Sequence, residues 1–410
     1  MNGRREIPRR WRLFNRALLI ALGIACLVEC GRCALEDSPE GAPSKSAEAL
    51  PDTLPQRDLS DSAEKIPFTS ENDRKEIDLS HVHAQRDTGL AHLMDTFLRR
   101  YRPKDALYLA VDPSTNEIIA WGERKEDAVQ IEPDYLSRAT FPAASLAKTV
   151  TLAAAFESKR YSLHSEIPLI GSAHKLYRRQ IQVPENYRGP LVPVHEAYAK
   201  SYNPPLAIIG MNVGAKRLRE AAEKLGFNRD YPNGLPEKSL YAPPDTGYAL
   251  AETACGFTQS VTLSPLQAAA MVRAVLQRRP LEIPWERNGA NGHAPRISED
   301  LGLQKFSDNT YLGLREAMVA TATVGTARKQ ISTRNISRRV FSDLEIGGKT
   351  GSLDGESPKG RYDWFMGFAK SKSDPKKSIV LVVMQVHGEM RTQTSTQIAA
   401  LLINYWAKEK

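Results

Sequence analysis

A serine and a lysine three residues apart, Ser145 and Lys148, are the pair with the clearest capacity for chemistry in this 410-residue chain. Positions i and i+3 lie on one face of a helix, so the lysine amine can reach the serine hydroxyl. A lysine in a dry pocket loses its proton more easily and can then act as the base that activates the serine. The pair therefore indicates acyl transfer through a covalent serine ester.

The spacing alone is weak evidence, because it recurs elsewhere. Three other pairs lie in spacer-like, loop-like or turn-like sequence: Ser62 and Lys65, Ser172 and Lys175, and Ser373 and Lys376. Ser145 instead opens the apolar run 146–156, which predicts a largely buried helix. A serine in this position is either a helix N-cap or a nucleophile, and this segment alone does not decide between the two.

A second motif, Ser201 and Asn203, stands in a proline-bounded loop between two helical patterns. A hydroxyl and an amide two residues apart can flank one pocket, where the first passes a proton and the second holds a substrate amide. A rival with the same spacing, Ser307 and Asn309, precedes an apolar helical pattern. We interpret Ser307 as the N-cap of that helix and Ser201 as the residue facing a cleft.

The third motif is Lys349-Thr350-Gly351-Ser352, which follows Gly347-Gly348 in a strand-like segment. Glycines weaken a strand unless something must approach its backbone, and a peptide-like substrate could use that space by docking as an added strand. Lys349 would supply a positive field, and the hydroxyls of Thr350 and Ser352 could bind a substrate carboxylate. Taken alone, the motif is more typical of a glycine-rich hairpin corner with a solvated lysine.

The N-terminal segment predicts export. Six arginines precede the apolar run 17–28, which is shorter than the roughly 20 residues of a membrane span. We interpret residues 1–34 as a signal peptide or N-terminal membrane anchor, with cleavage, lipidation and retention all open. The formal net charge of +8 owes much to these arginines and indicates targeting, not nucleic-acid binding.

Residues 35–85 are rich in Ser, Pro, Glu and Asp, which predicts a disordered polar spacer. A folded domain is expected at 86–410. It begins with a helical pattern near Thr88, and the strand-like runs 106–111 and 117–121 then predict a β-hairpin.

Helical patterns dominate residues 145–323, where we expect a mostly helical subdomain. Strand patterns return at 344–352, 362–369 and 379–386, followed by a helix from about 394 to 408. Strands at both ends of the domain predict an α+β fold, in which N- and C-terminal segments share one sheet. Cys255, the one cysteine beyond the leader, is interpreted as a small buried residue.

Taken in order, the three motifs resemble the transpeptidase domain of bacterial penicillin-binding proteins, which shares its motifs with β-lactamases. The resemblance covers roughly residues 88–408, with supporting segments at 256–259, 324–327 and 364–368. It implies the β-lactamase-like fold, with a five-stranded antiparallel sheet flanked by helices.

The resemblance also implies roles for single residues. Five are catalytic: Ser145 as nucleophile, Lys148 as its base, Ser201 as proton relay, Asn203 as donor to the substrate amide, and Lys349 as electrostatic partner. Substrate binding is expected at Thr350, Gly351 and Ser352. The backbone N–H groups of Ser145 and Ser352 would form an oxyanion hole.

The activity implied is that of a D,D-transpeptidase acting on stem peptides that end in D-Ala-D-Ala, with β-lactams acylating Ser145 as mimics. A serine β-lactamase needs a base for deacylation. Glu237 is a candidate, but Tyr241 stands where class A enzymes have asparagine, and Asn203 stands where class D enzymes have valine. A D,D-carboxypeptidase is an alternative, as is a β-lactam sensor or cell-wall scaffold without turnover.

No cofactor or metal is expected, because His81, His83 and His195 are scattered. The expected partners are stem peptides, β-lactams, cell-wall glycosyltransferases, and the cytoplasmic membrane through the N-terminal segment. The implied location is the bacterial cell envelope, with the catalytic domain on the periplasmic or outer face of the cytoplasmic membrane.

Overall fold

The computed structural model describes residues 82–84, 87–126, 135–231, 236–285, 302–389 and 391–409. The predicted leader 1–34 and the predicted spacer up to residue 81 lie outside these residues. Among the helices that are described, none is both long enough and apolar enough to span a bilayer. Strand β1 (Val82–Ala84) falls within the predicted spacer, so the prediction that the spacer reaches residue 85 is wrong at its end.

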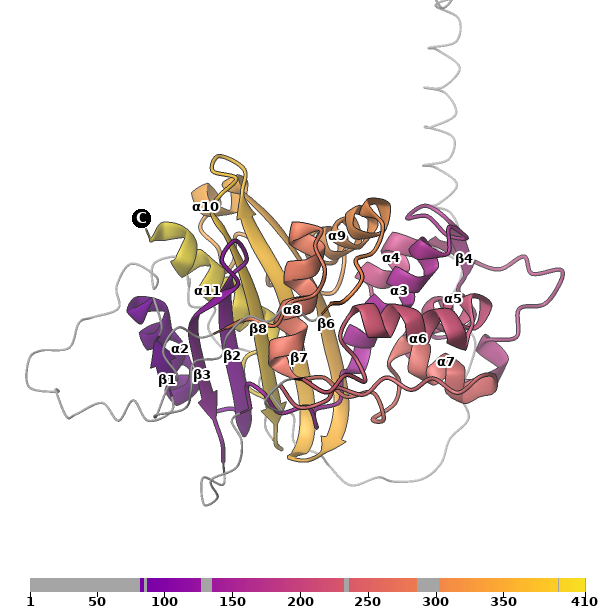
Figure 1. Ribbon diagram of the computed structural model, residues 1–410, viewed down its shortest axis with the longest axis horizontal. Coiled ribbons are helices and arrows are strands. Elements are labelled where there is room, and N and C mark those ends of the chain that lie inside the picture. The colour runs from indigo at the N-terminus through magenta and orange to yellow at the C-terminus, as the bar shows by residue number, and fades with distance from the viewer. Residues whose placement is uncertain are drawn as a thin grey trace, which may run out of the picture. The chain divides into compact units, whose positions relative to one another are not determined.

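One antiparallel sheet organises the domain, with the strand order β1-β3-β2-β8-β7-β6 (Figure 1). Its five long strands are β2 (Asp105–Asp112), β3 (Glu117–Arg124), β6 (Leu344–Glu356), β7 (Lys359–Ser371) and β8 (Ser378–His387). The pairing of β2 with β8 joins the N- and C-terminal segments, which confirms the predicted α+β sheet. The short strand β1 adds a sixth member beside β3.

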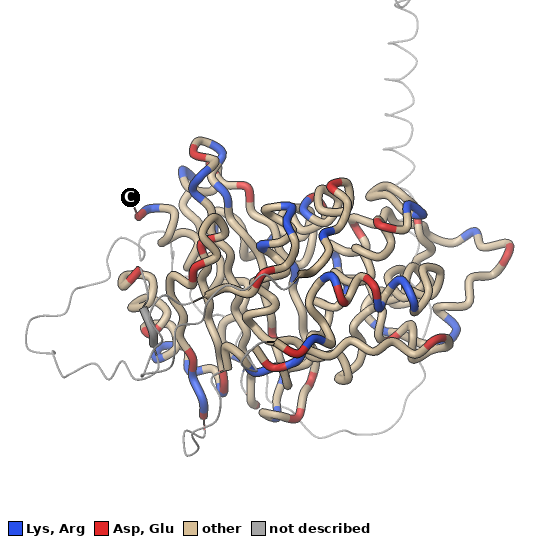
Figure 2. Tube along the Cα trace, viewed as in Figure 1, with Lys and Arg blue, Asp and Glu red and all other residues tan. Residues whose placement is uncertain are grey.

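Sequence periodicity explains how the sheet is covered on both faces. Along β2, Leu107 and Leu109 belong to one hydrophobic core while Tyr108 and Ala110 belong to the other, because successive side chains point to opposite faces. The central strand β8 carries no Lys, Arg, Asp or Glu, and Figure 2 shows charge gathered on the loops and outer helices instead. A near-continuous apolar run is typical of a strand that is buried on both faces.

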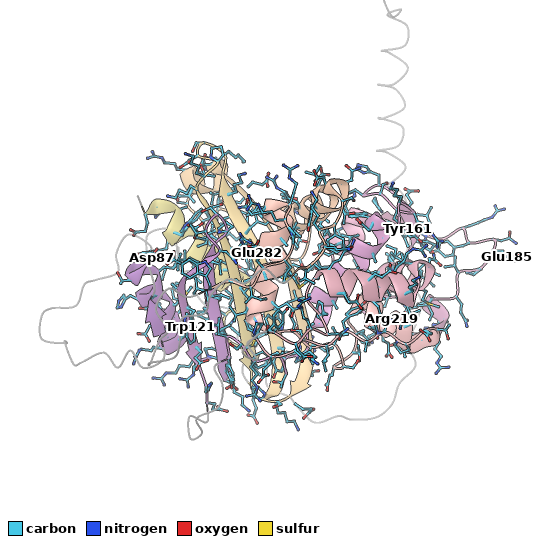
Figure 3. All side chains as sticks on the ribbon, viewed as in Figure 1. Asp87, Trp121, Tyr161, Glu185, Arg219 and Glu282 are labelled. Atoms are coloured by element: carbon cyan, nitrogen blue, oxygen red, sulfur yellow. The ribbon has the colours of Figure 1, made fainter. Side chains whose placement is uncertain are left out.

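Helices cover the two faces. The helices α2 (Thr88–Tyr101) and α11 (Ser395–Lys408) contribute to the core that contains Tyr108, and α8 (Pro265–Gln277) contributes to the opposite core. Asp87, labelled in Figure 3, caps α2 by accepting a hydrogen bond from the Leu90 N–H at 2.7 Å. These packed layers hold β6 at the edge of the sheet.

The remaining helices lie largely beyond the β6 edge (Figure 1). They are α3 (Lys148–Glu157), α4 (Val194–Ala199), α5 (Asn203–Val213), α6 (Ala215–Lys224), α7 (Gly247–Cys255) and α9 (Asp308–Thr323). The short elements are the 3-10 helices η2 (Ala144–Ala147) and η3 (Arg178–Gln180), the strand pair β4 (Glu166–Pro168) and β5 (Leu191–Pro193), and α10 (Arg338–Asp343). Glu185 lies on a loop between η3 and β5 that extends away from these helices (Figure 3).

Candidate active site

Ser145 lies in the 3-10 helix η2, immediately before α3 begins at Lys148. Neither helix has a side-chain cap, so the N-cap alternative for Ser145 is wrong. Instead, Lys148 Nζ lies 2.8 Å from Ser145 Oγ. The spacing of three residues therefore places the amine within hydrogen-bonding distance of the hydroxyl, which is the geometry that a general base and its nucleophile require.

Two glycines allow other segments to pack closely against η2. Gly256, with φ of +65°, has no room for a side chain, because an added Cβ would lie 2.0 Å from the carbonyl oxygen of Ala144. A Cβ on Gly351 of β6 would lie 3.3 Å from the carbonyl oxygen of Ala143. The segment that carries Ser145 is thus held between the end of α7 and the edge strand β6.

Lys148 is completely buried, and its amine has three neighbours. Besides Ser145 Oγ, they are Asn203 Oδ1 at 2.8 Å and the Cys255 carbonyl oxygen at 2.6 Å. Burial lowers the pKa of Lys148 to about 8, because the charged form loses its hydration. A neutral amine has two N–H donors and one lone pair. In the neutral form, with both donors used on Asn203 and Cys255, the lone pair would be directed at the Ser145 hydroxyl.

This environment predicts how acylation depends on pH. The predicted role of Lys148 as base requires its amine to be neutral. The second-order rate constant for acylation of Ser145 by a penicillin, the reaction that the sequence resemblance implies, should therefore fall about tenfold per pH unit below the lowered pKa of about 8 and level off above it. Stopped-flow or intact-mass kinetics between about pH 6 and pH 10 would measure the profile. A midpoint near the ordinary lysine value, or a flat profile below pH 8, would contradict the role of Lys148 as base.

Ser201 lies in the turn between α4 and α5, and Asn203 is the first residue of α5. Ser201 has φ of +59°, and its N–H donates to the Tyr198 carbonyl at 3.0 Å. Asn203 is held by two bonds to one loop, since its backbone N–H donates to Ala173 at 2.7 Å and its Nδ2 to His174 at 2.9 Å. These contacts fix the direction of the Asn203 amide, so that its oxygen meets Lys148.

Lys349 of β6 is also completely buried, but it bonds to the other serine. Its Nζ donates to Ser201 Oγ at 3.0 Å and to the Thr350 carbonyl at 3.0 Å, and it lies 5.3 Å from the centre of the Tyr198 ring. Burial, and then the charge of Lys148, lower the pKa of Lys349 well below its ordinary value. The structure therefore brings together the five predicted catalytic residues, as two serine–lysine pairs and Asn203, which contacts Lys148.

The predicted substrate-binding residues line the same edge. Thr350 and Ser352 are half-buried, and the Thr350 hydroxyl lies 2.5 Å from the hydroxyl of Thr326. Thr326 follows α9, and its N–H donates to the Ala199 carbonyl at 3.0 Å. Thr326 thus connects the strand carrying Lys349 with the end of α4, two residues before Ser201.

The expectation that Gly347 and Gly348 make room for a substrate is wrong. A Cβ on Gly347 would lie 2.8 Å from the Phe368 ring and 3.0 Å from the Val319 backbone nitrogen in α9. A Cβ on Gly348 would lie 2.6 Å from the Met366 carbonyl oxygen. These two glycines are needed because the domain packs tightly against its own strand at this point.

Two features that compete with the site have structural roles instead. Ser307 is confirmed as the N-cap of α9, because its hydroxyl accepts from the Thr310 N–H at 3.4 Å. Glu237, the candidate deacylating base, accepts a hydrogen bond from the Ala139 N–H at 2.9 Å, which ties it to the backbone of that segment. Across the described residues, no three His, Cys, Asp or Glu side chains are grouped so that they could hold a metal ion.

Three parts of the site were missed from sequence: the Cys255 carbonyl, the Thr326 hydroxyl, and the carbonyls of Ala173 and His174. Thr326 stands within the segment 324–327, which supported the resemblance but was given no role. The other missed groups are backbone atoms. Residue type carries no signal for a backbone acceptor, so only the fold could reveal them.

The sheet and the inserted helices bring two serine–lysine pairs together at the β6 edge. A family model described as "Penicillin binding protein transpeptidase domain" matches residues 106–404. The chain therefore belongs to the family of penicillin-binding protein transpeptidase domains.

Individual relatives agree with this family. The peptidoglycan D,D-transpeptidase PbpA of Mycobacterium tuberculosis is 27% identical over 265 residues, which cover 60% of this chain and 50% of the relative. Penicillin-binding protein 1B of Vibrio cholerae is 30% identical over 181 residues, covering 44% of this chain and 20% of the relative. This chain thus spans about half the length of the first of these curated relatives, and less of the second.

Solved structures agree with the fold. The crystal structure of PBPA from M. tuberculosis superposes with a TM-score of 0.57 at 19% identity, covering 80% of this chain and 82% of the other. An imipenem acyl-enzyme complex of penicillin-binding protein A from M. tuberculosis gives a TM-score of 0.55 at 21% identity, covering 80% of each chain. At this level of identity the likeness establishes the fold alone.

Proposed function

We propose that this protein is a penicillin-binding D,D-transpeptidase, which forms an acyl-enzyme on Ser145 from stem peptides ending in D-Ala-D-Ala. One observation carries the proposal. The buried amine of Lys148 touches Ser145 Oγ at 2.8 Å while two other oxygens occupy its donors. The PbpA relative is named a peptidoglycan D,D-transpeptidase, and its structural counterpart is described as an imipenem acyl-enzyme, which supports the same chemistry here.

The acylation step follows from these contacts. Lys148 Nζ accepts the hydroxyl proton as Ser145 Oγ forms a bond to the carbonyl carbon of the penultimate D-Ala. The backbone N–H groups of Ser145 and Ser352 stabilise the negative charge that develops on the carbonyl oxygen. The peptide C–N bond then breaks, the leaving D-Ala nitrogen takes the hydroxyl proton of Ser201, and Lys349, in contact at 3.0 Å, returns a proton to the Ser201 oxygen. Lys148 keeps the Ser145 proton until Ser145 is released, and Lys349 regains its proton from the attacking amine.

The remaining polar groups orient the donor peptide, meaning the peptide that acylates Ser145. Asn203 binds the substrate amide, because its own amide is fixed by His174 and Lys148. The terminal carboxylate lies near the hydroxyls of Thr350 and Ser352, in the positive field of Lys349. In the second half of the reaction, the amine of another stem peptide attacks the ester and releases Ser145, which forms the cross-link.

Two observations favour an amine acceptor over rapid hydrolysis. Glu237, the candidate for a deacylating base, is engaged by the Ala139 N–H. The neutral-amine arrangement of Lys148 serves acylation and, by reversal, attack by an amine. We place the catalytic domain in the cell envelope, outside the cytoplasmic membrane, with the N-terminal segment as leader or anchor and cell-wall glycosyltransferases as partners.

The proposal is tested with a labelled penicillin and the intact mass of the protein. We expect one covalent adduct per chain that persists after free penicillin is removed. A D-Ala-D-Ala peptide should then give a cross-linked product when an amine acceptor is added, in preference to the hydrolysed peptide. Absence of an adduct would contradict the mechanism. Rapid loss of the adduct with turnover of penicillin would instead indicate a β-lactamase, and hydrolysis alone would indicate a carboxypeptidase.

A further inference from the structure

Strand β6 is the last strand of the sheet, so every second residue directs its backbone N–H and C=O away from β7. The register with β7 is unbroken from Leu344 to Glu356. Thr350 and Asp354 belong to the outward set, because side chains bond to their carbonyls: Lys349 Nζ to Thr350 at 3.0 Å and Gln259 Nε2 to Asp354 at 2.9 Å. By the same alternation, Ser352 directs its N–H and C=O outward, midway between them.

The proposed function, on which this inference rests, fixes how a donor peptide meets this edge. Its penultimate residue lies opposite Ser352, since the Ser352 N–H binds the carbonyl under attack. With the terminal carboxylate near Thr350, the peptide runs antiparallel to β6. In an antiparallel pair, main-chain bonds recur every two residues. The N–H of the fourth residue from the peptide's C-terminus therefore lies opposite the Asp354 carbonyl, which already accepts a hydrogen bond from Gln259 Nε2.

The other end of the edge shows the complementary arrangement. The residue opposite Thr350 would lie two positions after the penultimate residue, where the donor peptide has already ended. The peptide therefore offers no main-chain N–H to the Thr350 carbonyl, which accepts a hydrogen bond from Lys349 Nζ instead. The outward carbonyls on either side of Ser352, those of Thr350 and Asp354, thus each accept a hydrogen bond from a side chain that competes with a peptide N–H.

The position of Gln259 in the chain explains how its side chain reaches the outward carbonyl of Asp354 on β6. Gln259 lies in the segment after α7, four residues beyond Cys255, whose carbonyl holds Lys148. We propose that Gln259 is a specificity-determining residue that ends main-chain pairing between the donor peptide and β6 at Ser352. The enzyme then recognises the main chain of the C-terminal residues and ignores the amide of the fourth residue.

The test uses two peptides, acetyl-Ala-Lys-D-Ala-D-Ala and the same peptide with an N-methyl group on its first alanine, the fourth residue from the C-terminus. The ratio of kcat/KM for D-Ala release from the two peptides should be close to one in the wild-type protein. In Gln259→Ala the Asp354 carbonyl is free to pair, so the unmethylated peptide should be preferred about fivefold, the effect of one net hydrogen bond.

Each ratio is taken within one protein, so a general loss of activity cancels. Gln259→Met, which keeps the length of the side chain but donates no hydrogen bond, should behave like Gln259→Ala. Gln182→Ala, at an exposed glutamine on the extended loop, should keep the wild-type ratio. A wild-type ratio already near five, or a ratio of one in both Gln259 variants, would overturn the inference. Wild-type protein that forms no penicillin adduct would overturn the proposed function and the inference with it.

Discussion

Replacing Ser145 with alanine is expected to abolish the penicillin adduct and to reduce release of D-Ala from a donor peptide by more than about 10⁴-fold. The expected loss is this large because the covalent intermediate cannot form without the hydroxyl, and no other serine contacts the Lys148 amine among the described hydrogen bonds. Intact-mass measurement after exposure to penicillin would show the loss of the adduct. Steady-state release of D-Ala would show the loss of turnover.

Ser373→Ala is the matched control, since Ser373 precedes Lys376 by the same three residues. The structure places this pair at the turn between β7 and β8, where Ser373 lies within hydrogen-bonding distance of Ser371. This variant should be acylated at the wild-type rate. An adduct that survives in Ser145→Ala would mean that another residue is the nucleophile, and the proposed mechanism would fail.

The difference between these two pairs shows what the sequence could predict. Equal spacing did not separate Ser145 from Ser373, but the apolar run behind Ser145 did, because a buried helix holds the lysine away from water. Periodicity likewise predicted the hairpin of β2 and β3 and the apolar strand β8, which the structure confirms. Strand β1 was missed because three residues are too few to show a period of two.

Contacts between distant parts of the chain were harder to predict from the sequence. Lys349 bonds to Ser201, which is 148 positions away, and Asn203 rather than Ser201 contacts Lys148. Residue types indicated that these groups belong to one site, but not which serine each lysine serves. Which lysine each serine contacts depends on the backbone of the turn, where Ser201 has a positive φ. A serine in the sequence does not indicate that conformation.

Backbone acceptors lay beyond sequence analysis altogether. The Cys255 carbonyl takes one hydrogen from Lys148, and the Asp354 carbonyl takes one from Gln259. Cys255 was correctly expected to be buried, yet its contribution comes from its main chain and would be the same for any small residue. Residue type therefore suggested Lys148 as the base, whereas the burial that lowers its pKa and the contacts that direct its amine followed only from the fold.

Replacing Lys148 with methionine is expected to lower the rate of acylation by about 10²- to 10⁴-fold, the usual contribution of a general base. Methionine fills much of the same volume but cannot accept the Ser145 proton. It also leaves Asn203 Oδ1 and the Cys255 carbonyl without the donor that they share. Because two buried acceptors lose a partner, thermal stability should change as well, and it needs to be measured beside the rate.

The pH profile separates a lost base from a disturbed fold. In the wild-type protein, acylation should rise with pH up to the lowered pKa of Lys148, about 8. In Lys148→Met that rise should disappear and leave a slow reaction driven by hydroxide or by another group. Lys376→Met, at the lysine of the control pair, should keep both the rate and the profile. If Lys148→Met retained the wild-type midpoint, the titrating group would be another residue, and Lys349, also buried beside a serine, would be the one to replace next.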